Sequence, residues 1–199
     1  MKRTIFSLAV VGTRILLGFI FFTAGMGKVT YGDYFPLTMF PMSLERLLAP
    51  HGLALLGHFI AWSQVVIGLL LLSQRFATIG AIMCVPLISN ILVVTISMGF
   101  KGTPYLNAFL LGLNLFLLAA DYHKIKFLFS DDVSEFKQIP VRRSSVKIDL
   151  LWLAGVGLCL AAAALHPVSR WLTFGLSGLG ICVFLACAVW HVLTRRSLQ

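Results

Sequence analysis

The stretch Arg14-Ile-Leu-Leu-Gly-Phe-Ile-Phe-Phe-Thr-Ala-Gly-Met-Gly-Lys28 is apolar between its two terminal cations, and the apolar run extends back to residue 8. An apolar segment of about 20 residues without period-2 alternation is typical of a membrane-spanning helix. The whole chain shares this character, with 59% hydrophobic residues, 12% charged residues and a mean hydropathy of +0.94. Because backbone groups in lipid need internal partners, the sequence predicts an all-α integral membrane protein.

Six spans are predicted along the 199 residues, at 8–27, 53–73, 76–98, 104–120, 148–165 and 171–193. They divide into a four-helix transmembrane bundle within 1–122, a basic cytoplasmic linker at 123–147 and a C-terminal transmembrane hairpin at 148–199. Residues 30–50 are rich in aromatic residues and proline, and they predict an extracytoplasmic loop at the interface with a short amphipathic helix that Ser43 caps. This loop is either a lid or an aromatic belt that holds the chain at the headgroups.

The net charge of +9 comes from basic residues that flank apolar runs and form no compact basic face, so nucleic acid is not predicted as a partner. With both termini in the cytoplasm, and leaving aside Arg14 within its span, eleven Lys and Arg residues lie inside and four outside, which satisfies the positive-inside rule. The N-terminal run is long enough to span and is not expected to be a cleaved signal peptide. We therefore predict a multi-pass protein of the inner (cytoplasmic) membrane that contacts membrane lipids.

All four cysteines lie inside apolar segments without a CxxC pair, so they are expected to pack as apolar side chains. No zinc spacing, phosphate-binding glycine loop or nucleophile elbow occurs in the sequence. The sequence does not place two histidines at the same depth in the membrane, so bis-histidine haem is not predicted. We expect no metal and no covalently bound cofactor.

Polar residues recur on one face of each of the first four predicted helices. In lipid, such side chains are expected to turn inward, where they either line a polar interior that binds a ligand or form interhelical hydrogen bonds. The candidate ligand-binding residues are Arg14, Lys28, His58, Gln64, Asn90, Asn107 and Asn114. No catalytic residue is predicted.

Arg14 differs from the other candidates because an arginine within a span costs a few kcal/mol and is a functional candidate by default. The alternatives are a structural ion pair with Asp121, at the inner end of the fourth span, and extension of the side chain to the inner interface. An ion pair would make Arg14 a structural residue.

The segment from Arg14 through Gly18 and Gly25 to Lys28 resembles the opening helix of the DoxX-like membrane family, which typically shows an arginine, a glycine four residues on, and a Gly-x-x-Lys ending. The resemblance continues through Gln64-Val-Val-Ile-Gly68 and Arg75-Phe-Ala-Thr-Ile-Gly80 and covers roughly residues 8–121. It implies a four-helix domain associated with quinone-linked or thiol and sulfur redox complexes. Gln64 departs from the glutamate that the family often carries, and the hairpin after residue 148 is an addition to the family core.

Three functions follow as hypotheses. The chain is a membrane subunit of a quinone-linked or thiol/sulfur redox system, with a quinone-like or lipid ligand in its polar seam. Alternatively it is a non-enzymatic membrane anchor or lipid-binding assembly component that holds a protein partner through its hairpin or basic linker. A small-solute transporter is the third, although the sequence shows no inverted repeat. Whether the protein is an enzyme stays open.

Overall fold

The computed structural model describes residues 2–29, 48–126, 146–165 and 169–196, and these residues contain helices and no strands. The helices are α1 (Lys2–Val29), the short 3-10 helix η1 (Ala49–His51), α3 (Ala54–Leu72), α4 (Ala77–Ser97), α5 (Thr103–Ala120), α6 (Tyr122–Ile125), α7 (Val146–Leu165) and α8 (Arg170–Arg196). The predicted all-α class is confirmed, and each predicted span overlies one long helix. The interfacial loop at 30–50 and the linker at 123–147 lie mostly outside the described residues.

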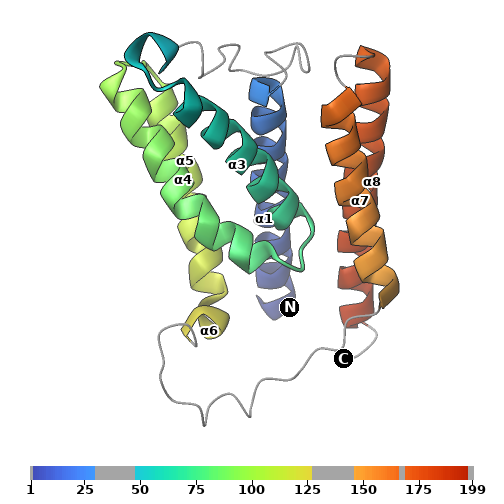
Figure 1. Ribbon diagram of the computed structural model, residues 1–199. Coiled ribbons are helices and arrows are strands. Elements are labelled where there is room, and N and C mark those ends of the chain that lie inside the picture. The colour runs from blue at the N-terminus through green and yellow to red at the C-terminus, as the bar shows by residue number, and fades with distance from the viewer. Residues whose placement is uncertain (1, 30–47, 127–145, 166–168, 197–199) are drawn as a thin grey trace.

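The first four long helices form an antiparallel bundle, in which α1 packs against α3 and α5 while α4 packs against the same two helices. Figure 1 shows the start of α1, the turn between α3 and α4, and α6 at one end of the molecule, which we call the inner end. The opposite end, with η1 and the start of α5, is the outer end. The short connections from α3 to α4 and from α4 to α5 favour this antiparallel arrangement of neighbouring helices.

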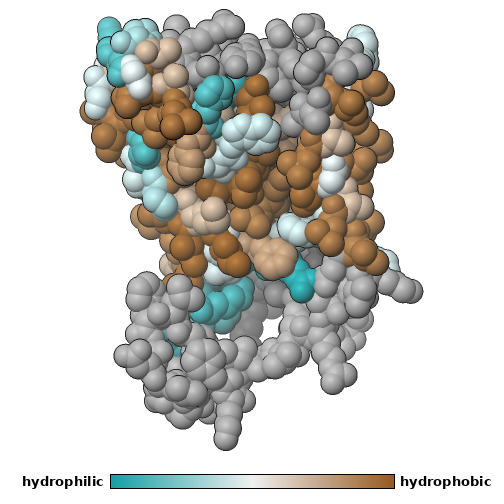
Figure 2. All heavy atoms as spheres, in the orientation of Figure 1, coloured by the Kyte–Doolittle hydropathy of each residue, from teal (hydrophilic) through white to brown (hydrophobic). Residues whose placement is uncertain are grey.

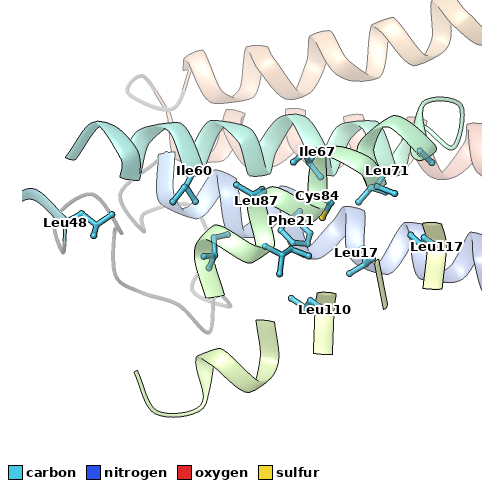
Figure 3. Packing of buried hydrophobic residues seen from close by; sticks show 14 residues of the cluster. Leu17, Phe21, Leu48, Ile60, Ile67, Leu71, Cys84, Leu87, Leu110 and Leu117 are labelled. Atoms are coloured by element: carbon cyan, nitrogen blue, oxygen red, sulfur yellow. The ribbon is translucent and has the colours of Figure 1, made fainter. Parts of the chain in front are cut away.

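The bundle core is apolar and draws side chains from all four helices, as Figure 3 shows. Leu17 and Phe21 of α1 lie among leucine and isoleucine side chains of the other helices. The buried residues of α5 recur at alternating steps of three and four, which is the spacing of a helix that turns one stripe towards its neighbours. That stripe is Asn107, Leu110, Asn114 and Leu117.

Helices α1 and α3 approach closely because glycines face the opposing backbone. A Cβ added to Gly68 would lie 2.5 Å from the backbone nitrogen of Phe22, and one added to Gly25 would lie 2.7 Å from the backbone nitrogen of Val65. Small residues in membrane helices permit this approach, which increases van der Waals contact between backbones. The contact also sets the register of the two helices, with Gly25 against the turn of α3 that holds Ala61 and Val65.

Helices α7 and α8 form a hairpin that docks on the α1–α3 side of the bundle (Figure 1). Cys159 and Phe184 of the hairpin share an apolar cluster with Phe22 and Val65, and the Trp152 ring lies 5.2 Å from the Phe76 ring. One face of the hairpin therefore packs within the chain, whereas the sequence had suggested an element for docking a partner. The protein partner remains a prediction.

Four helices are long and apolar enough to cross a membrane: Ile5–Val29 within α1, and α3, α4 and α5 in full. Their outward surface is largely apolar over the helices (Figure 2), and large side chains such as Leu55, Val93 and Phe109 are exposed there. In lipid such exposure is favourable. The described apolar parts of α7 and α8 are shorter, at Leu150–Ala162 and Trp171–Cys187, so the six-span topology and the cytoplasmic termini stay predictions.

Candidate functional site

The inner end of the bundle holds a fully partnered ionic cluster around Asp121. Arg14 Nη2 of α1 donates to Asp121 Oδ2 at 2.5 Å, and both side chains are buried. Thr78 Oγ1 of α4 donates to the same oxygen at 2.8 Å, and Lys124 Nζ of α6 donates to Asp121 Oδ1 at 2.7 Å. Of the two alternatives for Arg14, the structure contains the ion pair.

Asp121 lies just beyond the last residue of α5 and is the one acidic residue whose side chain the structure describes. Burial by itself raises the pKa of this carboxyl. The hydrogen bond from Lys124, the positive charge of Arg14 and the hydrogen bond from Thr78 outweigh burial, so the pKa of Asp121 lies below its ordinary value. The carboxylate is therefore ionised at neutral pH and serves to neutralise Arg14.

The second polar contact joins α1 to α3 nearer the outer end. Lys28 Nζ donates to Gln64 Oε1 at 2.6 Å; Gln64 is buried, and Lys28 is half-buried. The register set by Gly25 places Lys28 level with the turn of α3 on the outward side of Gln64. A lysine near a helix end ordinarily extends towards water, yet this side chain turns inward to a neutral amide.

Counting helical rise from the ion pair at the inner end places Asn107 of α5 at about the depth of Lys28. Fourteen residues separate Arg14 from Lys28 on α1, and fourteen separate Asn107 from Asp121 on the antiparallel α5. At 1.5 Å per residue both steps rise about 21 Å and return to nearly the same helical face. Asn107 is 9% exposed, and its Nδ2 is buried without a hydrogen-bond partner. We call Lys28, Gln64 and Asn107 the outer polar site.

Asn114 lies midway between these two levels and has a structural contact. Its Nδ2 donates to the backbone oxygen of Ala81 at 2.9 Å, which ties α5 to α4, while its Oδ1 is buried without a partner. The side chain is completely buried, with Leu110 and Leu117 on the same helical stripe. Of the two alternatives for the polar residues, Asn114 therefore follows the second, an interhelical hydrogen bond.

His58 and Asn90 do not join the other candidates. Both residues are exposed on the outward sides of α3 and α4. For α4 the expectation of an inward polar face is wrong, because the inward positions are filled by small and apolar residues that pack in the core: Ala77, Ala81, Cys84, Ile88 and Ile91. Asn90 and Ser97, two polar residues of α4, both face outward.

Sequence reasoning missed Thr78 and Lys124 as members of the ionic cluster. A signal for both existed, because Thr78 is in the first turn of α4 and Lys124 is three residues beyond Asp121, so both lie at the depth of that carboxyl. Neither residue stands out from its neighbours in the sequence. Their role is seen only when the structure shows that both bind the carboxylate of Asp121.

No protein-family model, curated protein or solved structure matches this chain.

Proposed function

We propose that the protein is a DoxX-like membrane subunit of a quinone-linked or thiol/sulfur redox system, and that its outer polar site receives the headgroup of a quinone-like ligand. The observation that carries the proposal is the pairing of Lys28 with Gln64 inside the bundle, at the height where the buried Asn107 amide nitrogen lacks a partner. A buried donor without an acceptor costs about 1–3 kcal/mol. A bound ligand oxygen would remove that cost.

The chemistry of the site suits a quinone. A quinone headgroup presents carbonyl oxygens, which accept hydrogen bonds from ammonium and amide groups, and its isoprenoid tail needs apolar surroundings. Both are close in sequence here, because Gln64 follows Ile60 by one helical turn, Lys28 follows Phe21 by two turns, and Ile60 and Phe21 belong to the apolar core. Pockets that combine apolar walls with a few convergent polar groups are the usual form of small-molecule sites.

The proposal includes the location of the protein. It places the chain in the inner membrane with six spans and with the inner end of the bundle facing the cytoplasm. Arg75, Lys124 and Lys126 all lie at that end, which is the distribution that the positive-inside rule favours.

The test is ligand binding by the purified full chain in mild detergent. A decyl-substituted benzoquinone should raise the unfolding temperature in a saturable way, since a ligand that binds only the folded state stabilises it. Asn107→Leu and Lys28→Met should weaken binding by about tenfold or more each, by loss of one hydrogen bond to the ligand.

Asn90→Leu is the matched control, because it removes the same amide from an exposed position on α4. Binding by this variant should equal that of the wild type. A wild-type protein that shows no saturable stabilisation by the quinone would refute the proposal.

The second candidate is a non-enzymatic anchor or lipid-binding assembly component. It is favoured by the exposed large side chains of the hairpin, including Leu153, Leu160, Trp171 and Leu179. Lipid covers such a face as well as a protein does, so this observation has less weight. A native mass spectrum of the gently solubilised chain separates the two candidates, because it reports the mass of a bound quinone, lipid or partner protein directly.

A further inference from the structure

Asn90 lies on the outward face of α4, and its side chain is exposed. Its amide makes no hydrogen bond to another residue that the structure describes. The neighbouring hydroxyls differ, because Thr95 and Ser97 donate to carbonyl oxygens of their own helix. An amide has two donor hydrogens and an acceptor oxygen, so a single backbone carbonyl could not satisfy it. Asn90 therefore presents an unpaired polar group on the outside of the bundle.

This amide lies within the span and not at its end. Helix α4 runs from Ala77 to Ser97, so Asn90 is thirteen residues from its first residue and seven from its last. At 1.5 Å per residue these steps rise about 20 and 10 Å. The whole of α4 is long and apolar enough to cross a membrane, which places the amide about 10 Å inside the outer boundary of the span.

The surroundings of this face offer the amide little. Helix α4 packs against α3 and α5, and Figure 1 shows the α7–α8 hairpin on the other side of the bundle. Lipid tails form no hydrogen bonds, and a polar group in hydrocarbon without a partner is costly. A long lysine side chain can extend to the headgroups, but the short side chain of Asn90 cannot reach across about 10 Å.

The residues around Asn90 leave room for another helix. Met83 and Ser97 lie seven residues before and after it, so the three share one side of α4. Pro86 and Val93 lie about one turn away, and all four neighbours are partly or fully open on this side. A flexible methionine adapts its shape to a partner, and a small serine permits close approach of a second backbone.

We propose that the outward face of α4 is the interface of a homodimer, in which the Asn90 amides of two copies bond to each other. Copies inserted in the same direction are related by a two-fold axis along the membrane normal, and this symmetry brings Asn90 to the same depth in both. An amide is self-complementary, because each copy can donate to the oxygen of the other. Asparagine side chains in membrane helices associate in this way.

The proposal is independent of the quinone-like ligand. Asn90 faces outward on α4, whereas the contact between Lys28 and Gln64 joins α1 to α3. A second copy satisfies the amide through symmetry alone. A different protein would have to supply a polar group at this depth, and a lipid tail supplies none.

The first test measures association of the full chain in phosphatidylcholine vesicles, by energy transfer between copies that carry a donor or an acceptor fluorophore at the C-terminus. Energy transfer in the wild type should rise with the protein-to-lipid ratio and saturate as a dimer. Asn90→Leu should weaken dimerisation about tenfold, the effect expected from two lost interhelical hydrogen bonds. Asn90→Gln keeps the amide and should retain most of the association.

Leu115→Ala is the matched control, because Leu115 is exposed on the outward side of α5. This variant should dimerise like the wild type. Asn90→Leu should also keep the proposed quinone binding, so loss of the dimer and loss of the ligand are separate results. A wild type that stays monomeric at every protein-to-lipid ratio, or equal association of the wild type and Asn90→Leu, would overturn the proposal.

The second test locates the interface by disulfide cross-linking in the same vesicles. Cys182 is exposed, so every variant carries Cys182→Ser to remove its thiol. Ser97→Cys places a thiol on the side of α4 that holds Asn90, and oxidation should convert it to a covalent dimer. Leu115→Cys on α5 should stay monomeric under the same conditions. Cross-linking at position 115 as efficient as that at position 97 would show that α4 is not the interface.

Discussion

Helices α1 and α5 carry polar side chains at two levels of the bundle, and the two levels differ in how those side chains are partnered. At the inner end Arg14 faces a carboxylate that also accepts from Thr78 and Lys124. At the outer polar site Lys28 contacts a neutral amide, and the Asn107 amide nitrogen has no partner. Arg14 has a counter-charge that ties helices together, whereas Lys28 has no acidic partner among the described residues, and we propose that it is available to a ligand.

The largest effect is expected from Asp121→Asn, which removes the carboxylate and leaves Arg14 buried without a counter-charge. Breaking a buried pair by removing one partner costs about 3–5 kcal/mol. Arg14→Gln should cost less, because Lys124 and Thr78 still bond to the carboxylate. Unfolding in mixed detergent and denaturant measures both free energies, and equal losses for the two variants would contradict the role of the cluster.

Gly68→Ala should have the next largest effect, because its Cβ would lie 2.5 Å from the backbone nitrogen of Phe22, which has no room to move aside. Overpacking of this kind costs about 1–3 kcal/mol. The variant should also weaken the proposed quinone binding, since α1 and α3 must separate and carry Lys28 away from Gln64. Gly112→Ala is the control, because a Cβ there meets nothing within 4 Å. A comparable loss of stability in the control would show that close packing at Gly68 is not the cause.

Lys28→Met should destabilise the protein by about 1–3 kcal/mol, because it removes the donor to the buried Gln64 Oε1. The loss should be smaller than that for Asp121→Asn, so one measurement distinguishes the two cations of α1. A loss for Lys28→Met as large as that for Asp121→Asn would show that the outer contact is structural too.

The smallest effect over the physiological range concerns pH. The pKa of Asp121 is lower in the folded protein than its ordinary value, so its ionised form contributes stability at pH values above about 4, the ordinary pKa of aspartate. That contribution is lost as the pH falls through the folded pKa. Between pH 6 and 8 the titration of Asp121 should leave the free energy of unfolding unchanged. At acidic pH the free energy of unfolding should fall less steeply in Asp121→Asn than in the wild type. An equal slope in the two proteins would show that other groups cause the acid destabilisation.

Hydropathy was sufficient to locate the long helices, because the length of a span and the need to satisfy backbone hydrogen bonds in lipid are properties of the chain itself. The Arg14–Asp121 pair was also within reach of sequence reasoning, because an arginine inside a span requires a partner and Asp121 is at a matching depth. Both inferences need only the position of a residue along its own helix.

The orientation of the polar faces was decided by the tertiary structure. Asn90 and Asn107 are both asparagines in apolar helices near the outer end, yet Asn90 faces outward and Asn107 is buried. The difference arises because α4 turns its small and apolar residues to the core, while α5 has asparagine and leucine on its one buried stripe. Likewise the sequence places Lys28 at a helix end, but the close α1–α3 contact at Gly25 and Gly68 is what brings its ammonium to Gln64, because a contact between helices depends on register and rotation that no single helix specifies.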